Sequence, residues 1–255
     1  MPRRRFALSV KPTKRKEAQG MTPLPSLGHA EAYLNIHLSR SGPGNFSRSA
    51  GPFVSVSRES GSGSGLFAKA LRPRLEQEFP GESQWVVFDR NLVEAMLQAR
   101  HLSPHIARFL PEDRVSEIDA SIGELIGLHP NIWSLIQRTN DMIRELARTG
   151  HAVLVGRGAN FATRNVPNGV HVRLAATPEF RAARMAEELN TTLEAAAAHN
   201  AHTDAARRAY VRSVFQADVT DPSCYDLVIN VETVPLDQAV EATVGLLRAR
   251  VAACV

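Results

Sequence analysis

A glycine-rich segment at residues 57–65, with the sequence SRESGSGSG, lies between a short apolar run and a stretch with helical spacing of apolar residues. A strand, a glycine-rich loop and a helix in this order are typical of phosphate-binding sites. Glycines let successive backbone N–H groups point at one anion, and the helix N-terminus adds partial positive charge. We therefore expect a nucleotide to bind at Ser60, Gly61, Ser62, Gly63, Ser64 and Gly65.

This loop departs from the common pattern of a glycine, four residues and Gly-Lys-Ser/Thr. Arg58 stands at the first glycine and Ser64 stands at the lysine. Lys69 is the only lysine in residues 21–255, and it lies more than one helical turn downstream. Arg58 could supply the lost charge from the other end of the loop. A flexible Ser/Gly turn without a ligand is the alternative interpretation.

Arginines recur at helical spacing in the second half of the chain. Arg181 and Arg184 are three residues apart, and Arg208 and Arg212 are four apart, so each pair lies on one helix face. Paired guanidiniums could hold phosphate groups. A solvated face with nearby acids as partners is the alternative interpretation, and the strong preference for arginine over lysine throughout this chain weakens any argument from arginine number.

Elements that could position these residues alternate along the chain. Short apolar runs predict five strands, at 53–57, 85–88, 152–155, 169–174 and 225–231. Helical patterns lie between and after them: one at 66–79, several within 91–149, one from the Thr177 cap to about residue 189, two pieces within 191–216, and one at 235–250. Strands that are apolar on both faces and separated by helices predict a parallel sheet covered on both sides, with ligands at the carboxyl ends of its strands.

Charge is divided unevenly along the 255 residues, whose net charge is +4. Residues 1–20 hold seven basic groups and one acid, and the remainder carries a small excess of acids. We expect a disordered basic tail and linker at 1–50 and one folded domain at 51–255. Nucleic-acid binding is not expected except weakly through the tail.

Composition excludes several further classes of protein. No apolar run approaches the roughly 18 residues of a membrane span, so no membrane partner is expected. Cys224 and Cys254 form neither a disulfide framework nor a metal pattern, and the nine histidines have no ligand spacing. A cytoplasmic location is the expectation, no protein-held metal site is expected, and the oligomeric state is left open.

Four segments in consistent order resemble the cytidylate kinase-like family, a branch related to bacterial cytidylate kinases among the P-loop nucleoside monophosphate kinases. They are SRESGSGSG, FDR after the second strand, VLVGRGAN after the third, and DPSCYDLVINV near the end. The resemblance covers about residues 53–250. The typical loop of that family, Ser-Arg-Glu, one residue and Gly-Ser-Gly-Gly, also lacks the lysine. Here Ser64 replaces the second glycine of the closing pair, where true cytidylate kinases carry lysine.

The resemblance implies a three-layer α/β/α P-loop kinase fold with a parallel five-stranded sheet. It also implies a helical acceptor-binding insert at 91–149 and an arginine-rich lid at 190–222. The implied reaction transfers the γ-phosphate of ATP, with Mg²⁺, to a nucleoside monophosphate such as CMP. Because such a reaction depends on positioning and charge neutralisation, we expect catalytic roles for Arg58, Arg184, Arg208 and Arg212, the last two ahead of Arg207.

The resemblance also implies acceptor-binding residues at two strand ends. Arg157, between two glycines, resembles the arginine that binds the acceptor phosphate; pairing with a surface acid is the alternative. Asp89 and Arg90 follow the second strand and match positions that contact the acceptor, although Asp89 could equally cap the next helix. Asp218 and Asp221 could lie near Mg²⁺ or could belong to a turn.

The sequence is compatible with two functions. The chain could be a kinase for CMP or a similar monophosphate, or a catalytically weak or inactive nucleotide-binding sensor or partner protein that lacks the loop lysine. The acceptor itself cannot be named from the sequence.

Overall fold

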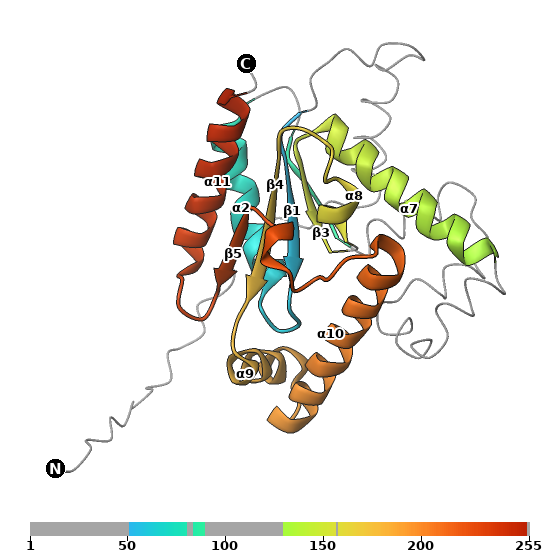
Figure 1. Ribbon diagram of the computed structural model, residues 1–255. Helices are drawn as coiled ribbons and strands as arrows, with labels where there is room; N and C mark the ends of the chain where they lie inside the picture. Colours follow the sequence, from blue (N-terminus) through green and yellow to red (C-terminus); the bar gives the residue numbers. More distant parts are fainter. Residues whose placement is uncertain (1–50, 81–83, 90–129, 157, 254–255) are drawn as a thin grey trace.

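A five-stranded parallel sheet forms the centre of the computed structural model, which describes residues 51–80, 84–89, 130–156 and 158–253 (Figure 1). The strand order is β2-β3-β1-β4-β5. The strands are β1 (Phe53–Arg58), β2 (Val86–Phe88), β3 (Ala152–Val155), β4 (Gly169–Ala175) and β5 (Leu227–Asn230). Every pair within it is parallel, so the predicted sheet is confirmed. Strands β2 and β3 lie on one side of β1, and β4 and β5 lie on the other. The chain changes from one side to the other after β3, and in parallel sheets such a change leaves a crevice at the carboxyl end of the central strand, here β1.

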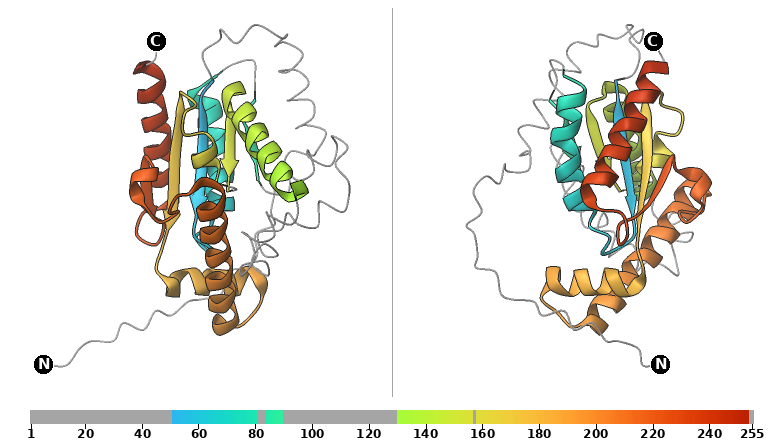
Figure 2. Two further views of the ribbon diagram at one scale, coloured as in Figure 1. Left: turned by 45° about the vertical axis from the view of Figure 1, so that its right-hand side comes forward. Right: turned by 90° about the vertical axis from the view of Figure 1, so that its left-hand side faces the viewer.

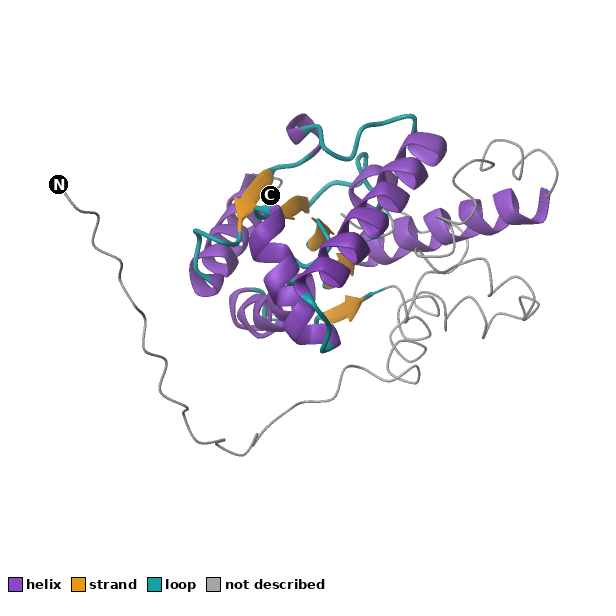
Figure 3. Cartoon of the chain, turned by 90° about the horizontal axis from the view of Figure 1, so that it is seen from below, coloured by secondary structure: helices purple, strands orange, loops and turns teal. Residues whose placement is uncertain are grey.

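Helices cover both faces of the sheet and confirm the three-layer α/β/α architecture. Helices α2 (Ser64–Glu78) and α11 (Leu236–Ala253) pack on one face, and α7 (Pro130–Thr149) with the single turn α8 (Ala159–Ala162) covers the other (Figures 1 and 2). Figure 3, which views the molecule from below Figure 1, shows the strands between the helices. Alternate β1 residues supply the two cores: Phe53 packs toward α7, and Val54 and Val56 pack toward α2 and α11.

A helical hairpin lies beyond the carboxyl ends of the strands (Figure 1). It consists of α9 (Pro178–Leu189) and α10 (Leu193–Phe215). The predicted start of α9 is confirmed, because Thr177 caps it by accepting a hydrogen bond from the Phe180 N–H. The prediction of two helical pieces within 191–216 is wrong: α10 is one helix of 23 residues. Neither proline nor glycine interrupts this stretch, and one face stays buried along its length.

Several expectations concern residues outside the described ranges. They are the basic tail and linker at 1–50, the helical insert up to residue 129, Arg90 and Arg157. Within the insert, the described part is α7, which is one of the helices expected within 91–149 and spans Pro130–Thr149. Among the described residues, no helix is long and apolar enough to cross a membrane.

His171 lies partly buried in the middle of β4. Its Nδ1 is 2.7 Å from the Ser55 Oγ on β1, and its ring meets the edge of Phe53. Its backbone N–H donates to Asp226, which in turn pairs with Arg250. Burial lowers the pKa of His171 below its ordinary value of 6.5; the Arg250 charge adds to this effect and the Asp226 charge opposes it.

The lowered pKa of His171 predicts that the free energy of unfolding decreases as pH falls below about 6.5. In that range the unfolded chain binds a proton that the folded chain resists, so acid favours unfolding. Urea unfolding at pH 7.5 and 5.5 measures the difference. His171→Asn keeps a polar partner for Ser55 but cannot titrate, so its pH dependence should be smaller. If the free energy of unfolding changed by the same amount between the two pH values in wild type and in His171→Asn, this role for His171 would be contradicted.

Candidate functional site

The glycine-rich loop after β1 has the geometry of an anion-binding turn. Gly61 and Gly63 both have φ of +79°, a left-handed conformation that side chains disfavour. A Cβ on Gly61 would also overlap the backbone carbonyl of Arg181. Helix α2 starts at Ser64, and no side chain caps its N-terminus. Its first N–H groups are therefore available to a negatively charged ligand.

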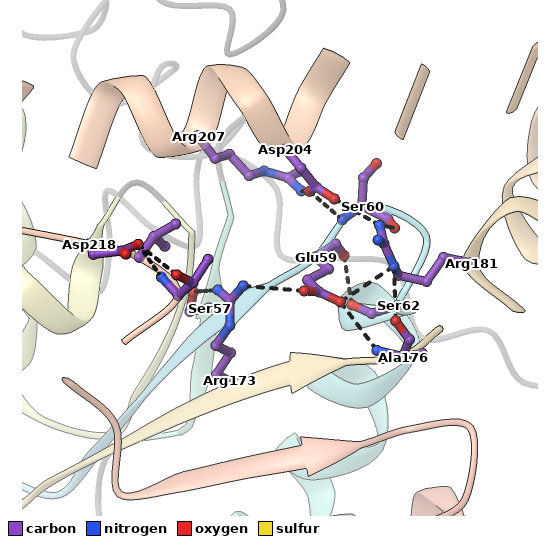
Figure 4. Close-up of polar contacts among 12 residues, drawn as sticks. Ser57, Glu59, Ser60, Ser62, Arg173, Ala176, Arg181, Asp204, Arg207 and Asp218 are labelled. Atoms are coloured by element: carbon purple, nitrogen blue, oxygen red, sulfur yellow. Dashed lines mark hydrogen bonds and ion pairs between the residues drawn. The ribbon is translucent and has the colours of Figure 1, made fainter. Parts of the chain in front are cut away.

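Glu59, within the loop, ties it to the end of β4 (Figure 4). Its N–H donates to the Leu174 carbonyl, and its carboxylate accepts from the Ala176 N–H at 3.3 Å. The same carboxylate lies 3.5 Å from the Arg173 guanidinium and 3.4 Å from that of Arg181. The loop therefore cannot leave β4 without breaking contacts to a partly buried charge.

Asp204 on α10 holds the loop from the other direction (Figure 4). Its carboxylate accepts from the Ser60 N–H at 2.8 Å and from Arg181 at 2.7 Å, and it lies 3.3 Å from Arg207. Only 13% of the Asp204 side chain is exposed. Arg181 also donates to the Ser60 carbonyl at 3.0 Å. The hairpin and the loop are thus joined by one mostly buried, charge-assisted network.

Arg184 brings a positive charge to the loop where the lysine is missing. A Cβ on Gly63 would overlap its guanidinium, so the two groups are in close contact beside Ser64. Arg173, Arg181 and Arg207 all pair with Glu59 or Asp204. Arg184, by contrast, has no ion pair or hydrogen bond within the described part of the chain.

Arg58 extends in a different direction, toward the end of β3. Its guanidinium carbon would lie 2.7 Å from a Cβ on Gly156, so the absent side chain at that glycine leaves the space that Arg58 fills. Gly156 has φ of +82°, and its N–H donates to the Val56 carbonyl. Arg58 is therefore directed away from Gly63 and Arg184.

A pocket of about 550 Å³, which includes solvent at its open mouth, lies between the ends of β1 and β3 and helix α10. We call it the arginine-lined pocket; its polar lining is Ser57, Arg58, Asn160, Arg207 and Tyr210. Valine and alanine side chains complete the wall, and no described lining residue is acidic. The pocket suits a ligand that combines a negative charge with an apolar part.

The remaining predicted residues lie in different settings. Arg208 and Arg212 are exposed on α10, whereas Arg207 faces the arginine-lined pocket. Asp89 directly follows β2 and is half-buried. Arg90 and Arg157 lie outside the described residues.

The described carboxylates do not form a site for Mg²⁺. Asp218 accepts from the Thr220 N–H and hydroxyl, which hold its pKa below the usual range, and Asp221 likewise accepts from Ser223. Both carboxylates cap turns, which for Asp221 is one of the two alternatives that the sequence left open. Glu59 and Asp204 are already paired with arginines. Among the described residues, no three potential ligands converge, so they form no cage that would hold magnesium without phosphate oxygens and water.

Sequence reasoning missed Glu59 and Arg173 and did not select Asp204 as part of the site. Arg173 is 6% exposed and stands in a strand that is apolar apart from Arg173 and His171. A charged residue in such a strand needs a partner, so the sequence of β4 already indicated that Arg173 is paired. The sequence around Asp204 gives no such indication, because its partners lie on other elements of the structure.

Comparison with known proteins places this geometry in context. The family model described as the cytidylate kinase-like family matches residues 53–233. An uncharacterized protein from Eubacterium ventriosum has a similar fold, with a TM-score of 0.59, 19% identity, and coverage of 78% of this chain and 99% of that one.

Two more distant structures also match. One is the shikimate kinase of Bacteroides thetaiotaomicron, with a TM-score of 0.41, 14% identity and coverage of 78% of this chain and 96% of that one. The other is TT1252 of Thermus thermophilus, with a TM-score of 0.45, 15% identity and coverage of 78% and 98%. No curated protein matches the chain. The family model spans more than half of the sequence, and the chain therefore belongs to the cytidylate kinase-like family.

Proposed function

We propose that this protein transfers the γ-phosphate of ATP to a nucleoside monophosphate such as CMP. The observation that carries the proposal is the pairing of a glycine-rich helix N-terminus, which no side chain caps, with an adjacent pocket lined by Arg58 and Arg207, whose described lining holds no acid. A donor phosphate chain and an acidic acceptor can then meet at the carboxyl end of β1. Membership of the cytidylate kinase-like family supports the same reaction class.

The ATP phosphates are assigned to the loop and to Arg184. The N–H groups that begin α2 bind phosphate oxygens, and the Arg184 guanidinium beside Gly63 neutralises charge that a lysine would otherwise meet. Glu59 and Asp204 hold the loop in position. Because their contacts are internal, they shape the site without touching the nucleotide.

The acceptor is assigned to the arginine-lined pocket. An oxygen of its phosphate attacks the γ-phosphorus of ATP, and the bond from that phosphorus to the β,γ-bridging oxygen breaks. The two products are ADP, which is the leaving group, and the nucleoside diphosphate. Positioning and charge stabilisation supply most of the catalysis in such transfers. Asp89, Arg90 and Arg157 remain acceptor-binding proposals that rest on the resemblance. No step is assigned to Mg²⁺.

The α9–α10 hairpin is proposed to act as the lid. Asn200 and Thr203 are buried on α10, and within the described chain their side-chain polar atoms lack partners. Buried polar groups without partners cost free energy, which favours a movement of the hairpin when a ligand arrives. Such a movement could also bring the exposed Arg208 and Arg212 to the phosphates.

A nucleotide-binding sensor without turnover is the second candidate. Ser64 at the lysine position favours it, because the loop itself carries no cation beside the β- and γ-phosphates. Both candidates bind ATP, and only the first consumes it in the presence of an acceptor.

The kinase proposal predicts that the full-length protein consumes ATP only when a monophosphate is added. A panel of CMP, UMP, AMP and GMP, assayed by ADP release and by detection of the diphosphate product, tests this. CMP is expected to be among the active acceptors. An ATP-induced thermal shift without turnover on any acceptor would instead support the sensor.

Removal of the Arg184 guanidinium should weaken ATP binding. Loss of a charge-assisted hydrogen bond costs about 1.5–3 kcal/mol, or roughly 10- to 100-fold in affinity. Calorimetric titration of Arg184→Ala measures this, and Arg248→Ala, which removes an exposed arginine on α11, is the matched control. Ser64→Lys should tighten ATP binding, and in the double variant Ser64→Lys/Arg184→Ala it should offset the loss of ATP affinity. Unchanged affinity in Arg184→Ala would exclude this role.

Replacement of Asp204 by asparagine keeps the shape but removes the charge that joins loop and hairpin. Two guanidiniums then lose a mostly buried partner, so the free energy of unfolding should fall by about 2–4 kcal/mol. Urea unfolding compares Asp204→Asn with Glu188→Gln, an exposed position on α9. Equal stabilities of the two variants would show that the network does not hold the hairpin.

A further inference from the structure

We propose that Arg58 recognises the anionic group of the acceptor and does not serve the ATP phosphates. This inference rests on the proposed function and divides the site arginines between its two substrates. It differs from the expectation that Arg58 replaces the loop lysine. The substrate class that follows is an acceptor that already carries a phosphate, rather than a neutral alcohol or an amine.

The direction of the Arg58 side chain is the first observation. The backbone of Arg58 ends β1 and leads into the loop, yet its guanidinium lies over Gly156 at the end of β3. Any side chain at Gly156 would collide with it. Arg58 and Gly156 are therefore complementary: the arginine replaces the first glycine of the usual loop pattern, and the glycine that follows the neighbouring strand β3 leaves space for it.

The surroundings of the guanidinium are the second observation. Arg58 and Arg207 both line the arginine-lined pocket, and none of its described lining residues is acidic. Arg207 pairs with Asp204 at 3.3 Å, so part of its charge is already balanced. A phosphate monoester in this pocket can accept hydrogen bonds from both guanidiniums, while Tyr210 and the valine side chains offer a surface for a flat ring.

The position of Arg184 is the third observation. It supplies a separate guanidinium against Gly63, at the N-terminal end of α2. The loop thus has a cation at each side: Arg184 beside the helix N-terminus and Arg58 beside the β3 end. Because each arginine contacts a different glycine, the loss of one should affect one substrate and spare the other.

Equilibrium binding separates the two roles without any need for turnover. CMP alone and the non-hydrolysable ATP analogue AMP-PNP alone are titrated calorimetrically into full-length wild type, Arg58→Ala and Arg184→Ala. Arg58→Ala should weaken CMP binding at least tenfold and change AMP-PNP binding less than twofold. Arg184→Ala should have the opposite pattern. Arg58→Lys, which keeps the charge but not the planar fork, should lie between wild type and Arg58→Ala for CMP.

Gly156→Ala provides a second test of the same contact. The added Cβ displaces the Arg58 guanidinium, so this variant should lose CMP affinity as Arg58→Ala does. The double variant Arg58→Ala/Gly156→Ala has no guanidinium to displace. Its CMP affinity should therefore be less than twofold below that of Arg58→Ala alone. Melting temperatures of all variants establish that each is folded, and Arg58→Lys replaces Arg58→Ala if the alanine variant does not fold.

The outcomes of these titrations distinguish the role of Arg58 from the kinase reaction. Unchanged CMP affinity in Arg58→Ala, or an equal loss for CMP and AMP-PNP, excludes the acceptor role while leaving the kinase proposal intact. Wild type that binds no monophosphate overturns both. Wild type that binds CMP through Arg58 but never consumes ATP overturns only the kinase reaction and supports the assignment of Arg58.

Discussion

The glycine-rich loop contains no lysine, and its position depends on two carboxylates, Glu59 within the loop and Asp204 on α10. Glu59 accepts hydrogen bonds from the end of β4, and Asp204 accepts one from the Ser60 N–H. Three guanidiniums, those of Arg173, Arg181 and Arg207, share these two charges. Since mostly buried charges are costly unless they are paired, these arginines stabilise the two carboxylates that hold the loop in place.

This network limits which arginines remain for ligands. Arg173 and Arg181 are occupied by Glu59 and Asp204, and Arg207 is held partly by Asp204. Arg184 and Arg58 lie at two different glycines, Gly63 and Gly156. The arginines of this site therefore differ in their surroundings. Arg173 and Arg181 hold the loop through its carboxylates, whereas Arg184 and Arg58 are proposed to set where negative charge from a substrate is favourable.

Much of the fold was predictable from local patterns. Apolar β-branched runs marked all five strands, and the Thr177-Pro178-Glu179 sequence marked the start of α9. The division of α10 into two pieces was wrong, because the Ala-rich stretch around Asn200 lacks a strong apolar stripe. Its buried face consists of small and polar residues, and contacts with α9 and the loop keep it one helix. Hydrophobic periodicity alone could not detect this.

For the site, the sequence determined the residue types, the loop and its place after the first strand, because these depend on neighbours in the chain. It predicted the loop residues and the arginines, but not the direction of Arg58 or the partners of Arg181. Only the tertiary structure decided these, since Ser60 meets Asp204 across 144 positions and Arg181 meets Ser60 across 121. A guanidinium becomes a structural anchor or a binding group according to which carboxylate or glycine lies beside it, and strand order and helix packing bring those groups together.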